Sequence, residues 1–486
     1  MKRFDIPTEV SRVTDALEAS SFKAFLVGGC VRDLLIDRTP KDWDVATDAT
    51  PEEIQGIFGD DSFYENDFGT VGVVSRETTD ETLKVVEVTP FRLEGGYSDF
   101  RRPDAVRFTK NVEDDLHRRD FTINAIALAK GKVVDPFDGQ KDLKNKVIRC
   151  VGEAEKRFGE DALRMLRAVR LSAELGFAID PDTAAAISQH SKLLEKISRE
   201  RIRDEFSRII MSEQPMIGLG LAERLGLLET VAPRLLETVG VEQGKAAHLY
   251  NVWEHSLRSL QHAADRQFPL EVRLAALFHD VAKPATKRTE EGQTTFYGHE
   301  VVGAKMAKEA LENLNFPKKV VEGVTKLVRW HMFFSDPDKV TLSAARRLVA
   351  RVGKESVWDL VNLRMCDRIG TGRPKEDPYR LRKYMSMIEE AMRAPVSVQM
   401  LKVNGEDLKN ELGIEPGPTY GHVLHALLEE VLEDPERNTR EYLLGRAKEL
   451  ATMPEKELAA LGRKAREAKE DEEGRELGEL RKKYRV

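Results

Sequence analysis

Apolar and polar residues alternate differently in the two parts of this chain. Over the first 150 residues, short apolar runs are separated by polar turns, whereas from Gly152 onward the pattern becomes that of helices. Short apolar runs are typical of strands, and three- to four-residue spacing is typical of amphipathic helices. Runs at 70–75 and 83–89 predict strands, and residues 4–22 predict a helix before them. We therefore expect an α+β protein in which a small mixed β-sheet head precedes a mostly α-helical neck, body and tail.

The length of the chain indicates several domains. One ordinary core does not extend over 486 residues, so two to four domains are expected. We place a head at 1–150, a helical neck at 151–238, a helical body at 239–395, a helical tail at 396–452 and a charged C-terminal helix at 453–486. The last segment mixes charges of both signs with few apolar residues, which is typical of a solvated helix.

Composition excludes several classes of protein. No stretch approaches the ~20 apolar residues of a membrane helix, and the first residues lack the apolar run of a secretory signal. The cysteines Cys30, Cys150 and Cys366 lie far apart and form no CxxC pair, so we interpret them as reduced core thiols of a cytoplasmic protein. The formal net charge of −7 does not itself indicate nucleic-acid binding, because a local basic groove decides that property.

The first candidate site follows an apolar run at 25–27, which predicts a buried strand. Gly28 and Gly29 end this strand in a turn and leave bare backbone N–H groups near the start of a helix predicted at 31–36. Such a place favours an anion, and Arg32 could add a forked contact to phosphate.

Two aspartates follow shortly after the glycine pair. Asp42 and Asp44 alternate on a strand predicted at 41–46, so their carboxylates face the same way. Like charges this close need a counter-charge, and oxygen ligands with room for phosphate suit Mg²⁺. Glu87 lies on the strand predicted at 83–89, and an antiparallel neighbour strand could bring it beside the pair as a third carboxylate. The alternatives are two surface aspartates at a strand end and a plain exposed glutamate.

A polar string at 118–125 reads RRDFTINA and carries a second candidate set. Asp120 and Asn124 are four residues apart, which places them on one face of a helix. Such a pair can bind ribose hydroxyls, while Arg119 supplies positive charge for phosphate. The alternative is a helix N-terminus capped by Asp120.

A third candidate set lies in the predicted helix at 160–170, which reads EDALRMLRAVR. Asp161 and Arg164 share a face at a spacing of three. Cytosine and adenine both present an amino donor beside a ring-nitrogen acceptor, and a carboxylate beside a guanidinium matches that edge. Guanine and uracil reverse the order and would leave buried polar groups unpaired. The alternative is an ordinary salt-bridged helix, in which a pair contributes only ~0.3–0.5 kcal/mol.

Together these strings resemble the signature of the nucleotidyltransferase superfamily, specifically bacterial CCA-adding enzymes (tRNA nucleotidyltransferases) and their poly(A) polymerase relatives. The resemblance implies addition of C and A from CTP and ATP to the 3′ end of tRNA. It also implies Mg²⁺ on Asp42 and Asp44, a catalytic Glu87, and a nucleotide site formed by Gly28, Gly29, Arg32, Arg119, Asp120, Asn124, Glu160, Asp161, Arg164, Arg167 and Arg170. Within that set, Glu160 is expected to orient the Asp161–Arg164 pair, and Arg167 and Arg170 to face the phosphates.

Three further segments match the same family more loosely. A glycine-rich stretch at 94–103 corresponds to a loop that helps the switch from C to A addition. The helix opening at 198–205 corresponds to a motif that buttresses the preceding helix, so we expect a structural role. Residues 403–442 resemble a C-terminal region that packs beside bound tRNA.

The helical body carries a second candidate metal site. Histidines and aspartates recur on predicted helices in the order H…HD…D, and His and Asp ligands on facing helices can converge within one bundle. Mixed nitrogen and oxygen ligands suit a divalent transition metal. The pattern resembles an HD-domain phosphohydrolase, which implies metal-activated attack of water on a phosphoester. The implied ligands of Mn, Ni, Fe or Mg are His255, His279, Asp280 and Asp367, with His299 and His331 in a dinuclear version and Lys283 and Lys287 near the phosphate.

Several functions remain open at this point. The main hypothesis is CCA addition, with a second phosphohydrolase activity in the HD domain. Some CCA-adding enzymes carry an active HD domain, and in others this domain has lost its ligands. The alternatives are a poly(A) polymerase, which the absence of a basic GRRF-like string disfavours, a partial enzyme that adds only CC or A, and an HD phosphohydrolase whose head merely binds RNA.

Overall fold

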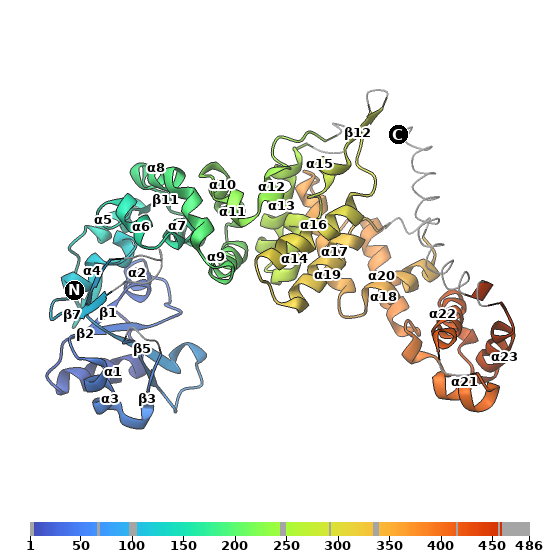
Figure 1. Cartoon of the computed structure of the whole chain (residues 1–486), viewed down its shortest axis with the longest axis horizontal. Coiled ribbons are helices and arrows are strands. Elements are labelled where there is room, and N and C mark those ends of the chain that lie inside the picture. Colours follow the sequence, from blue (N-terminus) through green and yellow to red (C-terminus); the bar gives the residue numbers. More distant parts are fainter. Residues whose placement is uncertain are drawn as a thin grey trace. The chain divides into compact units, whose positions relative to one another are not determined.

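The structure of the chain is a computed structural model that describes residues 4–65, 69–96, 105–243, 249–290, 293–333, 340–414, 417–454 and 457–458. The chain divides into two compact units. The first comprises Met1–Leu236 with Asn313–Phe316, and the second comprises Glu237–Glu312 with Pro317–Val486. A sheet occurs at the beginning of the first unit and helices dominate the rest, which confirms the predicted α+β class (Figure 1).

A seven-stranded mixed sheet forms the base of the first unit. Its strand order is β3-β4-β5-β2-β1-β8-β9, and β2 and β5 are parallel neighbours, whereas every other adjacent pair is antiparallel. The strands are β1 (Ala24–Val27), β2 (Asp44–Thr47), β3 (Ser62–Tyr64), β4 (Val71–Val74), β5 (Val85–Pro90), β8 (Ala127–Ala129) and β9 (Lys132–Val134).

Helices on this sheet follow the predicted apolar pattern. Helix α1 (Thr8–Ala19) buries Val10, Val13 and Leu17. Helix α3 (Pro51–Phe58) opens with a capping box, in which the backbone N–H groups of Glu53 and Thr50 donate to each other's side chains. Helix α1 confirms its prediction, because it lies within 4–22.

The strand predicted at 41–46 is shorter than expected. It begins at Asp44, and Asp42 lies in a bend before it. The reason is the partner strand: β1 ends at Val27, opposite Asp44, and the chain then turns at Gly28 with φ of +78°. Without a backbone opposite it, Asp42 has no ladder to join.

The neighbour of Asp44 also differs from the prediction. Glu87 on β5 faces Asp44 in the ladder, but the two strands are parallel, not antiparallel. The chain reaches β5 through α3 and the antiparallel strands β3 and β4, so β5 arrives in the direction of β2. The expected proximity of the two carboxylates is therefore achieved by a different connection.

A hairpin of β6 (Arg92–Gly95) and β7 (Ala105–Phe108) flanks the predicted glycine-rich loop at 94–103. Most of that loop lies outside the described residues. The remaining elements of the head are α2 (Gly29–Leu35), α4 (Val112–His117), the 3₁₀ helix η3 (Thr122–Asn124), α5 (Gly139–Asn145) and β10 (Val147–Ile148).

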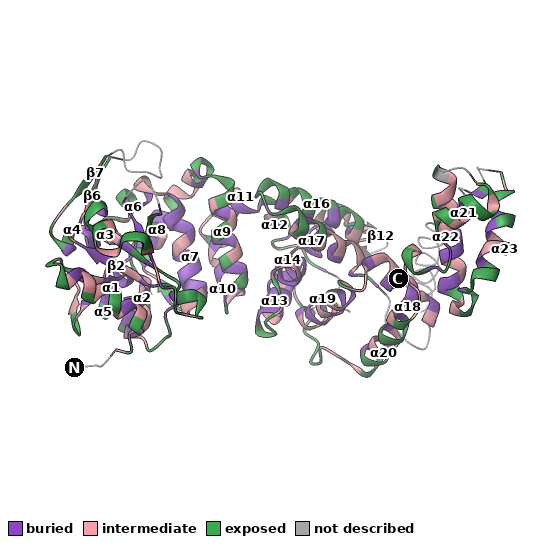
Figure 2. Ribbon diagram, turned by 90° about the horizontal axis from the view of Figure 1, so that it is seen from below, coloured by how far each residue is buried: buried purple, intermediate pink, exposed green. Residues whose placement is uncertain are grey.

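The neck is formed by short helices packed around α7 (Leu163–Leu175), which contacts α9 (Arg199–Met211) and α10 (Pro215–Arg224). Helix α7 is mostly buried (Figure 2), and its buried residues include Leu166 and Val169. The other elements are α6 (Ala154–Glu160), β11 (Ala178–Ile179), α8 (Pro181–His190), α11 (Leu228–Val231) and α12 (Pro233–Leu236). The single helix predicted at 160–170 is therefore wrong, because α6 ends at Glu160 and α7 starts at Leu163.

The second unit begins with a helical body. Helix α13 packs against α14 and α19, and α14 is buried on all sides from Val272 to Phe278, as expected for a central helix (Figure 1). The body consists of α13 (Val252–Asp265), α14 (Leu270–Phe278), α15 (Lys283–Thr286), the hairpin β12–β13 (Arg288–Glu290, Gln293–Thr295), α16 (His299–Asn313), α17 (Lys318–Trp330), α18 (Leu342–Val352), α19 (Val357–Gly370) and α20 (Tyr379–Arg393).

The tail continues from the body in the same unit. Arg346 on α18 donates to the backbone carbonyls of Leu432 and Glu433 at 2.6 and 2.7 Å and thereby binds the C-terminal end of α22. The tail helices are α21 (Gly405–Leu412), α22 (Pro418–Glu433) and α23 (Arg440–Ala451). Almost all of the charged helix predicted at 453–486 lies outside the described residues. Among the helices that the structure describes, none has the length and apolar character needed to span a membrane.

Candidate active site and metal centre

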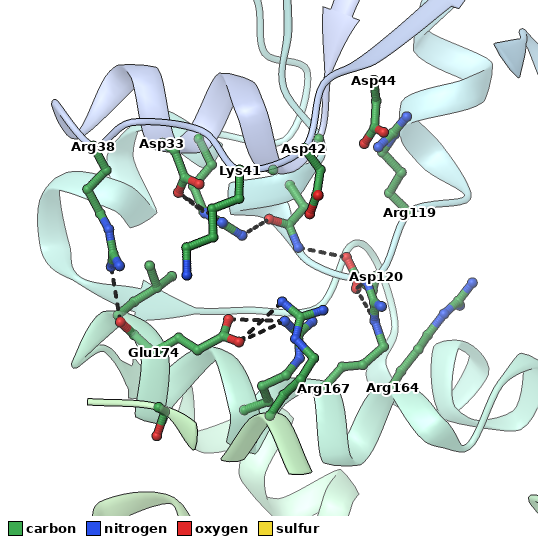
Figure 3. A pocket seen from close by; sticks show the side chains of 18 of the residues that line it. Asp33, Arg38, Lys41, Asp42, Asp44, Arg119, Asp120, Arg164, Arg167 and Glu174 are labelled. Carbon is green, nitrogen blue, oxygen red and sulfur yellow. Dashed lines mark hydrogen bonds and ion pairs between the residues drawn. The ribbon is translucent and has the colours of Figure 1, made fainter. Parts of the chain in front are cut away.

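A cavity of 780 Å³ in the first unit gathers the predicted nucleotide-site residues, and we call it the head–neck cavity. Its lining comes from β2, β5, the turn after β1, the segment around η3 and helices α7 and α9 (Figure 3). The predicted residues that line it are Gly28, Gly29, Arg32, Asp42, Asp44, Glu87, Arg119, Asp120, Asn124, Asp161, Arg164, Arg167 and Arg170. Glu160 stands beside this lining and bonds to Arg164.

Three carboxylates converge at the sheet edge of the cavity. Asp44 and Glu87 face each other across β2 and β5, and Asp42 precedes them. Burial raises the pKa of Asp44, Arg119 opposes that rise, and Asp42 adds to it. Partial burial and then the charge of Asp44 raise the pKa of Glu87 to about 7. The raised pKa values show that the positive charge of Arg119 does not compensate these carboxylates fully, so the donor set fits a hard divalent cation such as Mg²⁺.

Gly28 brings the backbone close to these carboxylates. A Cβ at this position would lie 2.8 Å from Nη1 of Arg119 and 3.3 Å from Oδ2 of Asp44, and φ is +78°. Both observations require glycine. Figure 3 shows the Arg119 guanidinium beside the Asp44 carboxylate. Backbone, guanidinium and carboxylate thus meet in one corner, as a site for metal-bound phosphate requires.

The position of Arg119 depends on Asp115, a residue that the sequence interpretation missed. The Asp115 side chain is fully buried on α4 and lies 2.7 Å from Arg118 and 3.2 Å from Arg119. Burial alone would raise the pKa of Asp115, but the two guanidiniums lower it below its ordinary value. Asp115 precedes Arg118 by three residues and Arg119 by four, a spacing typical of ion pairs on a helix, and the sequence therefore contained a signal for this contact.

Asp120 and Asn124 meet as predicted but not on an α-helix. Helix α4 ends at His117, and the next turn is the 3₁₀ helix η3. Asn124 Nδ2 donates to Asp120 Oδ1 at 3.1 Å, and Arg32 Nη1 donates to Asn124 Oδ1 at 2.9 Å. The backbone N–H of Phe121 also donates to Asp120, so local capping and a place in the cavity occur together.

Asp161 and Arg164 line the cavity without pairing with each other, which corrects the predicted i, i+3 pair. Arg164 donates to Glu160 Oε2 at 2.6 Å, as the orienting role of Glu160 implied. Asp161 lies between α6 and α7, where it accepts from the N–H of Leu163 and from both terminal nitrogens of Arg201, at 2.7 and 3.3 Å. The break between the helices separates the two side chains and gives each its own partner.

Arg201 is a second residue that the sequence interpretation missed as part of the site. It lies on α9, in the segment expected to be purely structural, and it lines the cavity. Its distance in sequence from Asp161 left no local signal. The structural role of this segment is also present, because Glu205 on the same helix accepts from Arg170 at 2.7 Å.

Arg167 bridges the neck and the head. Its Nη2 lies 2.7 Å from Asp120 Oδ2, and Asp120 raises the pKa of Arg167 above its ordinary value. Burial raises the pKa of Asp120, but Arg167 and the hydrogen bond from Asn124 outweigh it and hold that pKa well below its usual range. Arg167 and Asp120 therefore both stay charged, and the neck side of the cavity keeps the positive charge of Arg167.

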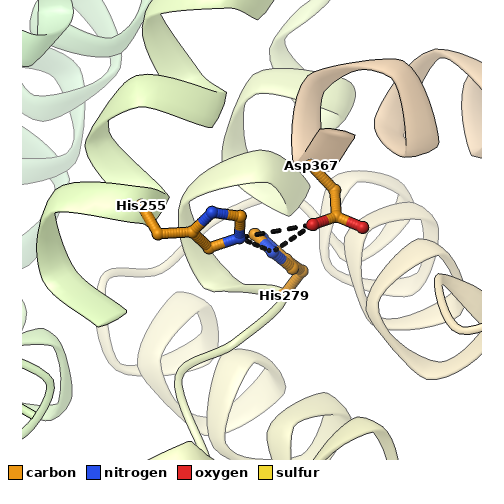
Figure 4. A group of neighbouring side chains, drawn as sticks. All are labelled: His255, His279 and Asp367. Carbon is orange, nitrogen blue, oxygen red and sulfur yellow. Dashed lines mark hydrogen bonds and ion pairs between the residues drawn. The ribbon is translucent and has the colours of Figure 1, made fainter. Parts of the chain in front are cut away.

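The second unit contains six buried or nearly buried ligand side chains, which we call the histidine–aspartate centre. One trio comprises His255, His279 and Asp367 (Figure 4), and the other comprises Asp280, His299 and His331. Within each trio the potential ligand atoms lie within 4.8 Å of one another. Nε2 of His255 is 2.9 Å from Nε2 of His279 and 3.3 Å from Oδ1 of Asp367.

Asp280 joins the two trios. Its Oδ2 lies 3.3 Å from Nε2 of both His255 and His279, whereas its Oδ1 lies 3.3 Å from His299 and 3.9 Å from His331. One carboxylate thus presents one oxygen to each group. The two trios could therefore each hold a divalent metal ion.

Backbone carbonyls fix the orientation of three of the histidine rings. Nδ1 of His279, His299 and His331 lies 2.9, 2.8 and 2.7 Å from the carbonyl oxygens of Ala276, Phe296 and Val328. An N–H at Nδ1 leaves the lone pair on Nε2, which is the atom that points inward in each case. The rings are therefore prepared as neutral metal ligands.

The charges around the centre also fit a cation. Burial would raise the pKa values of Asp280 and Asp367, but neighbouring histidines and cationic side chains hold both pKa values well below the ordinary range. Lys283 Nζ lies 2.6 Å from Asp280 Oδ2 and is buried, whereas Lys287 is exposed at the end of α15. Carboxylate oxygens together with imidazole nitrogens suit divalent transition metals.

Two arginines on α19 adjoin the centre and were not predicted. Arg364 Nη1 donates to Asp367 Oδ2 at 2.7 Å, on the opposite oxygen from the histidines. Arg368 Nε donates to the carbonyl of Lys375 at 2.7 Å. Burial, followed by the charges of Arg373 and Arg364, lowers the pKa of Arg368.

Three known protein families match successive parts of the chain. Residues 24–149 match the poly A polymerase head domain, residues 176–238 match the family described as a probable RNA and SrmB-binding site of polymerase A, and residues 246–371 match the HD domain. The chain is 36% identical to a CC-adding tRNA nucleotidyltransferase of Thermus thermophilus, over 84% of this chain and 89% of that protein. It is 32% identical to a CCA-adding enzyme of Ligilactobacillus salivarius, over 92% of this chain and 98% of that protein. The chain belongs to the CCA-adding enzyme family of tRNA nucleotidyltransferases and carries an HD domain.

A solved structure supports this membership. The CCA-adding enzyme of Bacillus stearothermophilus in complex with CTP has a TM-score of 0.67 and 29% identity, and the match covers 91% of this chain and 99% of that one. Other CCA-adding enzyme structures, one in complex with ATP, match at 19% identity and show the shared fold.

Proposed function

We propose that this tRNA nucleotidyltransferase adds C and A to the 3′ end of tRNA, with CTP and ATP as substrates and no nucleic-acid template. The observation that carries the proposal is the head–neck cavity, which combines a carboxylate cluster, a glycine corner and a neck wall with Asp161 and Arg164. The names of the relatives supply the acceptor and the two nucleotides.

Each group of residues receives a role from its position. Asp42, Asp44 and Glu87 would hold Mg²⁺, which when bound polarises phosphoryl oxygens and the attacking hydroxyl. The backbone at Gly28 and Gly29, with Arg32 and Arg119, binds and orients the triphosphate in the same corner.

Base selection falls to the neck. Asp161 presents an acceptor and Arg164 presents donors, and Glu160 and Arg201 hold the two side chains in place. Because these contacts match the edges shared by cytosine and adenine, UTP and GTP would leave polar groups unpaired. Asp120 and Asn124, held by Arg167 and Arg32, provide acceptor and donor groups for ribose hydroxyls.

The extent of addition follows from the relatives. CCA-adding enzymes match over more than 90% of this chain, which supports complete addition. The Thermus thermophilus relative adds only CC by its name, so a partial product is the alternative that a product analysis distinguishes. The tail at 396–452 is proposed to contact tRNA, the domain boundaries remain those predicted from the sequence, and a cytoplasmic location stays a prediction.

The transfer role is tested by Asp44→Asn. Incorporation of labelled CTP into a tRNA transcript that lacks CCA is expected to fall at least about a thousand-fold, because the metal-binding carboxylate is lost. Asp182→Asn, an exposed aspartate on α8, is the matched control and is expected to keep wild-type incorporation. Equal activity of Asp44→Asn and the control would contradict the assignment.

We also propose that the HD domain is a metal-dependent phosphohydrolase that binds Mn, Ni, Fe or Mg. The specific observation that favours this second activity is Asp280, which presents one oxygen to each ligand trio. The two trios would hold the metal, which when bound would activate water for attack on a phosphoester, and the buried Lys283 adds positive charge.

The HD activity is tested by His279→Ala, with exposed His425→Ala on α22 as the matched control. Manganese-dependent hydrolysis of p-nitrophenyl phosphate is expected to disappear in His279→Ala, because one metal ligand is removed, while CTP incorporation into tRNA stays within about two-fold of wild type. Undiminished hydrolysis in His279→Ala would contradict the assignment of this activity to the HD domain.

A further inference from the structure

Basic side chains gather at the C-terminal end of α19, beside the histidine–aspartate centre. Arg364, Asp367 and Arg368 are spaced by three and four residues and therefore share one face of the helix. Asp367 turns one oxygen toward His255, and its other oxygen accepts from Arg364. The Arg364 side chain is 31% exposed, so it connects a candidate metal ligand with the surface.

The segment after α19 folds back and extends this positive surface. Arg368 binds the carbonyl of Lys375, and Gly372 has φ of +87°. A Cβ on Gly372 would lie 2.5 Å from Leu249, so the segment packs closely against the residues just before α13. Because His255 lies near that end of α13, the exposed Arg373 and Lys375 are held next to the centre.

Acidic residues nearby do not cancel this charge. Glu376 lies 2.6 Å from the His262 ring and 3.7 Å from Arg266, so the guanidinium just after α13 already balances its charge. We call Arg364, Arg368, Arg373 and Lys375 the basic ledge.

An aromatic side chain follows the basic ledge. Tyr379 begins α20 and is 69% exposed, an unusual state for a large ring. Exposed aromatic rings beside cations are the combination with which proteins bind single-stranded nucleic acids, since bases stack on the rings while phosphates meet the cations.

We propose that the basic ledge binds the phosphates of a single-stranded RNA end and directs its terminal phosphate to the histidine–aspartate centre. This inference rests on the proposed phosphohydrolase function and gives it a substrate class. A mononucleotide has one phosphate group, for which the centre and Lys283 suffice. Arg368, Arg373 and Lys375 add three further cations beside the ligand Asp367, and a polynucleotide, which carries one phosphate per nucleotide along its strand, offers partners for them.

The test uses the full-length protein with Mn²⁺ and two substrates. One is a six-nucleotide RNA with a 3′-phosphate, and the other is p-nitrophenyl phosphate. The variant Arg368→Ala/Arg373→Ala leaves all six candidate ligands intact. The control Lys318→Ala/Arg393→Ala removes the same charge from exposed positions on α17 and α20.

We expect the KM of the ledge variant for the RNA to rise about ten-fold, with kcat/KM for p-nitrophenyl phosphate within about two-fold of wild type. The salt dependence of RNA binding is expected to weaken by about 1.4 in logarithmic slope, as for two lost phosphate contacts with a single strand. The control is expected to change neither value. Equal losses with both substrates, or no change with the RNA, would overturn the proposal.

Failure of the underlying activity gives a different result. If wild-type protein hydrolyses neither substrate with Mn²⁺, Ni²⁺, Fe²⁺ or Mg²⁺, the phosphohydrolase function is wrong. Fluorescence anisotropy of the same RNA then tests the ledge by binding alone. At least about three-fold weaker binding of the ledge variant than of the control would support the ledge, and equal affinities would overturn it.

Discussion

Carboxylates in the head–neck cavity illustrate how single residues are adjusted by their neighbours. Burial raises the pKa values of Asp44 and Glu87, and the charges of neighbouring carboxylates add to both rises. Asp115 and Asp120 experience the reverse, because adjacent arginines keep their pKa values low despite burial. The same residue type is thus prepared as a metal ligand on one side of the cavity and as an anchor for guanidiniums on the other.

The raised pKa of Glu87 predicts a pH dependence of stability. Its pKa rises from an ordinary value of 4.5 to about 7, so between these values the folded chain holds a proton that the unfolded chain has released. The unfolded state binds fewer protons, and the free energy of unfolding therefore falls as the pH rises from about 4.5 to about 7. Glu87→Gln cannot release that proton and is expected to lose less stability over this range.

Urea unfolding at pH 5 and pH 8 without Mg²⁺ measures this difference. Exposed Glu77→Gln is the matched control and is expected to follow wild type. Added Mg²⁺ is expected to reduce the loss in wild type, because a cation favours the ionised carboxylate. If the free energy of unfolding changed equally between pH 5 and pH 8 in wild type and in Glu87→Gln, the pKa of Glu87 would not be raised by its surroundings, and the prediction would be wrong.

At the scale of elements, the sequence predicted which residues belong together better than it predicted the local geometry. Asp120 and Asn124 were expected on one α-helical face, and a hydrogen bond joins them across a 3₁₀ turn instead. Asp161 and Arg164 were expected as an i, i+3 pair, but two helices meet between them. A sequence motif shows which residues contribute to a site. The exact ends of helices and strands depend on tertiary packing, which a local sequence pattern does not contain.

Tertiary partners were the main omission. Arg201 reaches Asp161 from another helix, whereas Arg364 contacts Asp367 at a spacing of three on the same helix, a local signal that went unused. By contrast, all six side chains that gather in the histidine–aspartate centre were named from the sequence, because their H…HD…D order on predicted helices resembles an HD domain. Asp115 had a local signal at spacings of three and four, and it went unused because acidic residues on a helix are common.

Helix α9 offers a prediction at this scale, because it holds the connection between α6 and α7 through Arg201. In Arg201→Ala, the Asp161 carboxylate loses its bidentate partner while it keeps the N–H of Leu163. Discrimination of CTP over UTP is expected to fall about ten-fold, since the base-reading carboxylate is no longer fixed. Stability is expected to fall by only about 1 kcal/mol, because the pair is partly exposed.

Single-nucleotide incorporation with CTP, ATP, GTP and UTP measures this effect. Arg203→Ala is the matched control on the same helix, since Arg203 points to Asp204 and away from Asp161. Arg201→Lys is expected to recover part of the discrimination. A uniform loss with all four nucleotides would indicate general damage to the neck.

The whole molecule divides its chemistry between two units. The head–neck cavity lies in the first unit, and the histidine–aspartate centre lies in the second. The two candidate sites share no residue, so each can be inactivated without chemical damage to the other. We therefore expect RNA-end synthesis and phosphoester hydrolysis to be separable by mutation.

The central claim is complete, template-independent CCA addition, and sequencing of reaction products tests it most directly. A tRNA transcript that ends before CCA is incubated with CTP alone, with ATP alone and with both. We predict products that end in CC with CTP alone, in CCA with both nucleotides, and no long A tail with ATP alone. Products that stop at CC when both nucleotides are present, or long A tails with ATP alone, would contradict this account.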